Sequence, residues 1–329
     1  MPELRKDPIL GRWVIISQER ENRPCIYEDT VLNTENVKDC PFCPSNEKCT
    51  PPEILSYKNS SADSWQVRVV SNKYPALKIE CQSDCKKEGL YEFLDGVGAH
   101  EVIIETPEHI KHMADMDRGN LALVFKAFKD RIVDLRGDKR FKYILVFKNY
   151  KSLAGATLEH PHSQLIALPM IPIRVEQELE GAKKYYDKNN VCVFCDIMKQ
   201  EQNAKKRVIC QNDKFIAFVP FASRFPYETW ILPKKHLGHF ENTSDEDMEA
   251  LSEIAGLHMR KLKKLLGEVP FNFMIHSSPL TEKENKYYHW HIEIFPNLSK
   301  AAGFEWGSGF YINYLPPEEA AEKLNKVTV

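Results

Sequence analysis

The segment His160-Pro161-His162-Ser163-Gln164 is the part of this 329-residue sequence best suited to chemistry on phosphorus. Side chains alternate between the two faces of a β-strand, so His160, His162 and Gln164 are expected to point the same way. A neutral imidazole can attack phosphorus near pH 7, and the phospho-imidazole that forms is labile enough to react again. We therefore expect His162 to be a nucleophile and Gln164 to donate its amide N–H to a phosphoryl oxygen. Taken alone, however, the motif fits a core histidine or a metal ligand better.

Two Cys-x-x-Cys pairs indicate two metal sites, because two thiolates and two imidazoles suit tetrahedral zinc. The first predicted site consists of Cys40, Cys43, His109 and His160. The second predicted site consists of Cys192, Cys195, His236 and His291. Buried thiols or redox pairs are the alternative interpretation. His112 and His239 each follow a predicted ligand by three residues, so they can substitute as ligands or simply lie on a helix surface.

An internal repeat predicts the elements that position these residues, since residues 40–169 can be laid over residues 192–296. Each half runs from Cys-x-x-Cys through a β-type run ending in Pro and His, then a helix and a strand, to a strand carrying His-x-His. The second helix is expected to begin at Ser244, with Asp247 three residues on. This order predicts duplicated α+β units, as domains 1–181 and 182–329, with the polar, Lys-rich stretch 182–190 as the joint.

Composition and charge exclude several classes of protein. The net charge of -2, from 45 basic and 47 acidic residues spread along the chain, gives no stripe for tracking nucleic acid. The sequence has no secretory signal and no apolar run of membrane-spanning length. We therefore expect a soluble, cytoplasmic protein that binds neither nucleic acid nor membrane, and a reducing setting in which nine cysteines do not form a disulfide framework.

The sequence resembles the galactose-1-phosphate uridylyltransferase family within the histidine-triad superfamily. The resemblance covers nearly the whole chain, including residues 11–17, residues 68–75 and the His160–Gln164 motif. It implies two tandem histidine-triad-like units, each an antiparallel sheet with packed helices. Gln164 stands where hydrolases of the superfamily carry a third His, which is similar to the transferase branch. The family reaction is ping-pong, and His162 matches its nucleophile.

The same resemblance implies further contacts to the substrate. Arg20 and Arg23 match basic residues near the nucleotide phosphates, and Asn72 and Asn149 match polar nucleotide contacts. Gly155 and Thr157 occupy the loop before the strand that carries His162, and Ser163 follows His162 on that strand. All three are predicted to bind substrate. Without the resemblance, the arginines are ordinary surface residues and the asparagines are ordinary turn residues.

The second half departs from the common family pattern. Glu178, His276 and His291 match three ligands of an iron site made from one Glu and three His, but Glu293 stands in place of the last His. The pair Cys192 and Cys195 is similar instead to the two-zinc variant of plant ADP-glucose phosphorylases. The expected cofactor is therefore zinc at two sites, with iron possible at the second.

Uridylyl transfer from UDP-glucose to galactose 1-phosphate is the leading functional hypothesis. The runner-up is adenylyl transfer from ADP-glucose to phosphate, and a zinc-stabilised nucleotide-binding module without catalysis represents a different class. Gln164 disfavours a hydrolase, and no P-loop or dinucleotide fingerprint is present in the sequence. The expected partners are a nucleotide sugar, a hexose 1-phosphate and, from the family, a second copy of the chain in a homodimer.

Overall fold

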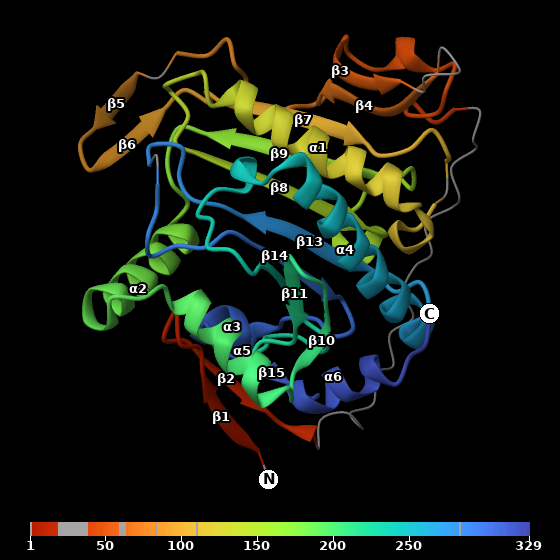
Figure 1. Cartoon of the computed structure of the whole chain (residues 1–329). Helices are drawn as coiled ribbons and strands as arrows, with labels where there is room; N and C mark the ends of the chain where they lie inside the picture. Colours follow the sequence, from red (N-terminus) through yellow and green to blue (C-terminus); the bar gives the residue numbers. More distant parts are fainter. Residues whose placement is uncertain (1, 19–38, 59–63, 83, 110, 283) are drawn as a thin grey trace.

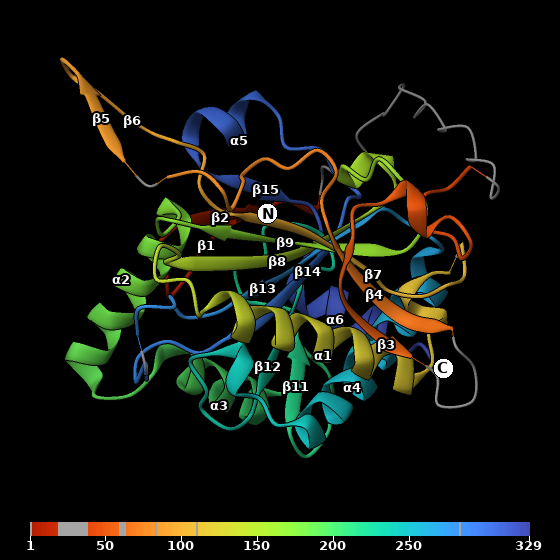
Figure 2. The same cartoon turned by 90° about the horizontal axis from the view of Figure 1, so that it is seen from above.

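The structure is a computed structural model, and it describes residues 2–18, 39–58, 64–82, 84–109, 111–282 and 284–329. A twisted antiparallel sheet runs through the molecule, and Figure 2 shows helices α1 and α4 on one side of it. Strands β1, β2 and β15 and helix α5 lie on the other side. The fold is therefore α+β, as the sequence predicts.

Ten strands of the described residues make up this large sheet. Their bounds are β3 Glu53–Lys58, β4 Trp65–Ser71, β7 Ala99–Ile104, β8 Tyr143–Tyr150, β9 His162–Leu168, β10 Val208–Gln211, β11 Phe215–Phe218, β12 Thr229–Pro233, β13 Phe271–His276 and β14 His291–Pro296. Smaller sheets contain β1 Glu3–Lys6, β2 Trp13–Ile16 and β15 Tyr311–Asn313, and the hairpin β5 Cys85–Glu88 with β6 Tyr91–Leu94.

Helices cover the sheet and its edges. The α-helices are α1 Arg118–Leu135, α2 Ile173–Asn189, α3 Val193–Ala204, α4 Asp245–Leu266, α5 Gly303–Ser308 and α6 Pro317–Asn325, and the short 3-10 turns are Glu47–Cys49, Met113–Asp115, Ser152–Ala154 and Phe240–Asn242. Helix α4 begins as expected, because the side chain of Ser244 accepts a hydrogen bond from the backbone N–H of Asp247. Among the described residues, no helix has the combination of length and apolar character that crossing a membrane requires.

The strand order mirrors the sequence repeat. The sheet runs β10-β11-β12-β14-β13 in one half and β8-β9-β7-β4-β3 in the other (Figure 1). The halves join where β13 pairs with β8, with Asn272 opposite Asn149. Helices α1 and α4 pack side by side over this junction. Each half therefore places its His-x-His strand, β9 or β14, next to the strand at the central junction.

Alternation along the strands sorts the core from the site. Ile144 and Val146 of β8, and Phe273 and Ile275 of β13, belong to the apolar core that includes α1 and α4. Because successive side chains point to opposite faces, the remaining residues of these strands lie on the far side of the sheet. The far face carries His162, and it is the face on which the functional groups gather.

One expectation about a connecting segment is wrong. The stretch 182–190, predicted as a joint, forms the C-terminal half of α2, which ends at Asn189, and the left-handed capping residue Asn190. The proposed boundary between residues 181 and 182 therefore falls inside a helix, and the division into two domains stays a prediction.

Candidate active site and metal centres

His162 is the first residue of β9 and is almost fully buried, at 8% exposure. Its Nδ1 lies 2.7 Å from the carbonyl oxygen of His160. A carbonyl oxygen can only accept, so Nδ1 carries the proton and Nε2 keeps its lone pair. Burial lowers the pKa of His162 from its ordinary value. The ring is therefore neutral near pH 7, with a nucleophilic nitrogen at Nε2.

A buried ion pair holds the backbone of this residue from behind. Lys148 donates to Glu105 over 2.7 Å and to the carbonyl oxygen of His162 over 3.1 Å. Ser163 donates to the other carboxylate oxygen of Glu105. Both members of the ion pair are only 3% exposed, so the contacts are shielded from solvent.

The position of Ser163 corrects one expectation. Its side chain points to the face of β9 opposite His162, is 1% exposed and is bonded to Glu105. Ser163 was predicted to bind substrate, but alternation along the strand turns it away from the site. It supports the strand instead.

Gln164 lies on the same face as His162, and its Oε1 is 2.8 Å from Nε2 of His100. His100 lies on the neighbouring strand β7, where Val102 pairs with Gln164. His100 is not among the residues that the sequence predicts for the site. Its position on the site face follows from strand alternation, but its contact with Gln164 depends on the pairing of two distant segments.

The asparagines predicted to contact the nucleotide, Asn149 and Asn72, lie near the residues described above. Asn149 Oδ1 accepts from Asn272 Nδ2 over 2.8 Å. Gly155 adopts φ +92° in the loop after β8, and a Cβ there would lie 3.4 Å from Asn149 Nδ2. Asn72 is close to His100, while Thr157 lies exposed on the loop. Arg20 and Arg23 lie outside the described residues.

The first predicted metal cluster assembles with all four members. The ligand atoms of Cys40, Cys43, His109 and His160 lie within 4.8 Å of one another, and Cys40, Cys43 and His160 are buried. His160 Nε2 donates to the carbonyl of Thr106 over 2.8 Å, which leaves Nδ1 facing the sulfurs. This donor set and its outer hydrogen bond are compatible with zinc.

The second cluster also assembles, but with a different histidine. It contains Cys192, Cys195, His236 and His289. His289 Nε2 donates to the carbonyl of Pro233 and its Nδ1 faces Cys195, as His160 does in the first half. The prediction of His291 as the fourth ligand of this cluster is wrong, because His289 is the repeat counterpart of His160.

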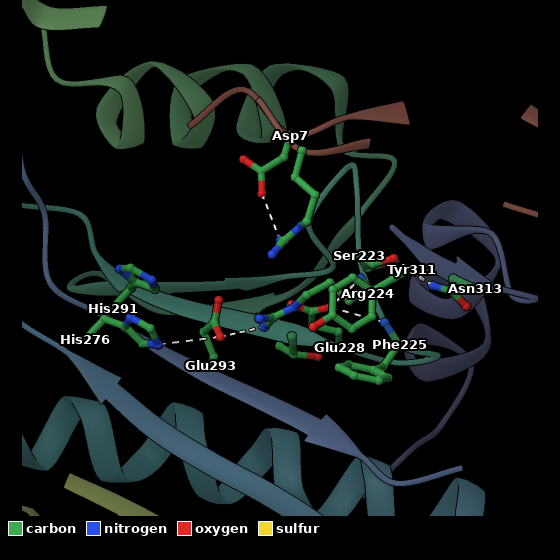
Figure 3. Close-up of polar contacts among 12 residues, drawn as sticks. Asp7, Ser223, Arg224, Phe225, Glu228, His276, His291, Glu293, Tyr311 and Asn313 are labelled. Atoms are coloured by element: carbon green, nitrogen blue, oxygen red, sulfur yellow. Dashed lines mark hydrogen bonds and ion pairs between the residues drawn. The ribbon is translucent and has the colours of Figure 1, made fainter. Parts of the chain in front are cut away.

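His291 belongs to a third group, with Glu178 and His276, whose ligand atoms also lie within 4.8 Å of one another. Figure 3 shows two of its members, His276 and His291, and the charged side chains of Glu293 and Arg224 that continue from His276. His276 faces Glu293, which accepts from Arg224 over 2.6 Å, and Arg224 also donates to Glu228. Burial alone would lower the pKa of His276, but Glu178 and Glu293 outweigh it and raise the pKa to about 10.

The two His-x-His strands therefore differ in their surroundings. His291 Nδ1 lies 3.1 Å from the carbonyl of His289, the same local contact that His162 makes with His160. Glu293 pairs with Met274 in the register where Gln164 pairs with Phe147. In the second half, the imidazole of His291 faces the carboxylate of Glu178. In the first half, the side chains on the same face as His162 include the amides of Gln164 and Asn149. Of these two described strands, only β9 combines an uncharged neighbour of the imidazole, Gln164, with an Nε2 that faces no carboxylate.

A cavity of about 1130 Å³ opens on the same face of the sheet. It is lined by Met274, His276, Glu293 and Phe295 from the second half, and it extends to Leu153 in the loop after β8. His162 and Gln164 do not line it. The cavity therefore lies beside His162 and Gln164 and does not contain them.

Comparison with known proteins identifies the family to which this chain belongs. A family model described as the N-terminal domain of galactose-1-phosphate uridyl transferase matches residues 1–172, and one described as a domain of unknown function matches residues 97–328. The chain is 38% identical over 334 residues to ADP-glucose phosphorylase from Arabidopsis thaliana, covering 100% of this chain and 93% of the relative. It is 29% identical over 338 residues to galactose-1-phosphate uridylyltransferase from Thermotoga maritima, covering 100% and 99%.

Solved structures agree in fold. The crystal structure of an ADP-glucose phosphorylase from Arabidopsis thaliana with bound ADP-glucose has a TM-score of 0.88 and 36% identity, with 100% of both chains covered. A structure described as uridylyltransferase has a TM-score of 0.77 and 29% identity, covering 99% of this chain and 97% of that one. These similarities confirm the expected fold and the expected kinship. The chain belongs to the galactose-1-phosphate uridyl transferase family, whose members named here are nucleotide-transferring enzymes.

Proposed function

We propose that this protein is a nucleotidyltransferase that carries the nucleotide on His162, with ADP-glucose as donor and inorganic phosphate as acceptor. The observation that supports the covalent step is the hydrogen bond from Nδ1 of His162 to the carbonyl of His160. It leaves Nε2 as a nucleophile in a neutral ring. A nucleotide-binding module without catalysis would not need this tautomer or the adjacent Gln164.

The reaction proceeds in two half-reactions. Nε2 of His162 attacks the phosphorus that bears adenosine, the bond from that phosphorus to the bridging oxygen breaks, and glucose 1-phosphate leaves with the electron pair. An oxygen of inorganic phosphate then attacks the same phosphorus, the N–P bond breaks, and ADP leaves. The imidazole returns to its neutral form. No separate base is needed, because the acceptor is already ionised.

The residues around His162 hold it in position and stabilise negative charge on the phosphoryl group. Gln164 and Asn149 present amide N–H groups on the nucleophile's face, where they can bind phosphoryl oxygens as charge develops. Lys148 and Glu105 keep the backbone of His162 in place. Each Cys2His2 cluster would hold zinc as a structural ion, and the first joins His160, next to the nucleophile, to the segment around Cys40 and Cys43.

The donor is chosen from the relatives. ADP-glucose phosphorylase from Arabidopsis thaliana is 38% identical to this chain. A similar crystal structure, of an ADP-glucose phosphorylase from Arabidopsis thaliana, contains bound ADP-glucose. The presence of Cys2His2 clusters in both halves of the described chain supports the same choice. Uridylyl transfer from UDP-glucose to galactose 1-phosphate is the second candidate, because the matching family model and the Thermotoga maritima relative carry that name.

We also propose that the protein acts as a homodimer in the cytoplasm. Ile173 and Trp306 are exposed at 70% and 73%, and a second copy of the chain could cover these apolar side chains. The described cysteines form no disulfide with one another, as a reducing compartment favours.

The test is intact-mass analysis of the protein after incubation with ADP-glucose or UDP-glucose without an acceptor. The proposal expects an adenylyl adduct that phosphate discharges and that His162→Ala lacks. A uridylyl adduct discharged by galactose 1-phosphate would establish the second candidate. No adduct with either donor, in protein with full metal content, would overturn covalent transfer and favour a binding module.

A further inference from the structure

The contact between His100 and Gln164 has a direction that the backbone fixes. The N–H of Ala76 lies 3.1 Å from Nδ1 of His100. A backbone N–H can only donate, so Nδ1 of His100 must accept. A neutral imidazole has one proton, and that proton must therefore lie on Nε2. Nε2 is the atom that faces Gln164.

The proton on Nε2 then orients the amide of Gln164. Nε2–H donates to Oε1 of Gln164 over 2.8 Å. The two ends of a glutamine amide are alike in shape, so the bonding partner decides which end points where. With Oε1 turned to His100, the NH2 group of Gln164 is the end left to donate to a ligand on the face of His162.

A neighbouring amide fits the same assignment. Asn72 Oδ1 accepts from the backbone N–H of Tyr74 over 2.9 Å, so its NH2 group is the end near His100. Asn72 Nδ2 lies 3.2 Å from His100 Nε2. Two donors cannot bond to each other, and the shorter contact to Gln164 is therefore the hydrogen bond. The NH2 group of Asn72 is also left to donate to a ligand.

We propose that His100 is a positioning residue, a fixed Nε2–H tautomer that holds Gln164 with its NH2 group toward the phosphoryl group on His162. This inference rests on the proposed function, because it concerns how Gln164 binds a phosphoryl oxygen. If Gln164 could turn over, its carbonyl oxygen would face the negative phosphoryl oxygens and oppose the reaction. A donor fixed before the reaction needs no reorganisation when charge builds up.

The kinetic test measures the rate of nucleotidylation in single turnover for four variants. Removing one such donor in Gln164→Ala is expected to lower the rate about a hundred-fold. His100→Leu leaves Gln164 in place but free to turn, and is expected to lower the rate roughly ten-fold. His100→Gln keeps an N–H near the position of Nε2 and is expected to recover most of the loss. The double variant His100→Leu/Gln164→Ala should be as slow as Gln164→Ala alone, because His100 acts through Gln164.

The outcomes separate the inference from the proposed function. A wild-type rate in His100→Leu, or losses that multiply in the double variant, would overturn the positioning role while leaving the function intact. A Gln164→Ala variant that reacts at the wild-type rate would remove the role proposed for Gln164 itself. Zinc content and thermal midpoint, measured for each variant, identify any loss that comes from misfolding.

A spectroscopic readout tests the tautomer without any turnover. Long-range proton–nitrogen NMR on protein with 15N-labelled histidine distinguishes a protonated ring nitrogen from a bare one, and His100→Gln identifies the signals of His100. The inference expects a protonated Nε2 and a bare Nδ1. A protonated Nδ1 would overturn it, because Nε2 would then be unable to donate to Gln164.

Discussion

At the scale of single residues, neighbours give the same side chain different properties. His162 and His291 each hold a proton on Nδ1 through the carbonyl two residues before them. His291 faces the carboxylate of Glu178, whereas His162 lies on the face that carries Gln164. The same imidazole is therefore part of a charged network in one half and has an uncharged neighbour, Gln164, in the other.

A chain of amides supports Asn149 and gives a prediction. Asn272 Nδ2 donates to the backbone carbonyl of Ala154, which fixes that end as NH2, and to Oδ1 of Asn149. Asn297 donates to the other end of Asn272. Asn272→Ala should therefore free Asn149 and raise the KM for the donor about ten-fold, the effect of losing one good hydrogen bond.

Initial rates over a range of donor concentrations check this expectation. Asn297→Ala is the matched control, because it leaves both donated bonds of Asn272 in place and should change KM much less. Equal effects of the two substitutions would contradict the role given to Asn272.

The correction at the second metal cluster gives another prediction. His289→Ala should lose about one equivalent of zinc per chain, since a site with three remaining ligands binds zinc more weakly. His291→Ala should keep the zinc of that cluster, because His291 is not among its ligand atoms. Elemental analysis of the purified variants measures both. Loss of zinc from His291→Ala with retention in His289→Ala would restore the original assignment.

Residue types and spacing predicted much of the candidate site, with instructive exceptions. The sequence placed Cys40, Cys43, His109 and His160 together, and the structure does the same. His291 was predicted as a ligand, but aligning the two His-x-His motifs gives the first His of each motif, His160 and His289, as the ligands. His100 was missed because its partner Gln164 is 64 residues away, and strand pairing cannot be read from one sequence.

At the scale of elements, a buried histidine makes helix α4 sensitive to acid. His258 is fully buried, and burial, with a smaller effect of Lys261, lowers its pKa from 6.5 to about 3. The unfolded chain therefore binds a proton below pH 6.5 that the folded protein does not. The stability that this group contributes is present above pH 6.5 and is lost as the pH falls toward 3.

His258→Leu should remove this dependence. At pH 5 the wild type should lose about 2 kcal/mol more stability, relative to pH 7.5, than the variant loses. Urea unfolding at the two pH values measures the difference. Identical losses in the two proteins would mean that His258 takes up its proton in the folded state as readily as in the unfolded one.

Close packing of α2 against the N-terminal segment gives a further prediction. A Cβ at Gly181 would lie 1.9 Å from the carbonyl oxygen of Ile9, which is backbone and cannot move aside alone. Gly181→Ala should therefore destabilise the protein by about 2 kcal/mol. Gly303→Ala is the control, because nothing lies within 4 Å of its Cβ position.

Thermal unfolding of both variants tests this packing. A stable Gly181→Ala variant would contradict the close contact between α2 and the N-terminal segment.

Periodicity predicted the regular elements better than the connections. Apolar spacing identified α1 and α4, because each buries one face against the sheet. The stretch 182–190 was taken for a joint because it is polar and rich in lysine. It is instead the mostly exposed end of α2, whose buried residues Val175, Glu178, Leu179 and Ala182 lie before this stretch or at its first position. A mostly solvated helix and a linker have similar composition.

At the scale of the whole molecule, the two repeats form one sheet. The repeat predicted two similar units, and the pairing of β13 with β8 joins them into a continuous ten-stranded sheet of the described residues. This junction brings Asn272 of the second half to Asn149 of the first. The position of Asn149 near His162 and Gln164 therefore depends on both halves, although His162 and Gln164 come from one. Sequence periodicity could not reveal the junction, because it depends on contacts between segments more than 100 residues apart.

The central claim is that a nucleotide is held covalently on His162 between two half-reactions. Exchange of labelled glucose 1-phosphate into ADP-glucose, without inorganic phosphate, tests it most directly. The account predicts exchange by the wild type at a rate comparable with turnover and none by His162→Ala with full metal content. Wild-type protein that converts ADP-glucose and phosphate to products but shows no exchange would contradict it, because transfer would then be direct between two bound substrates.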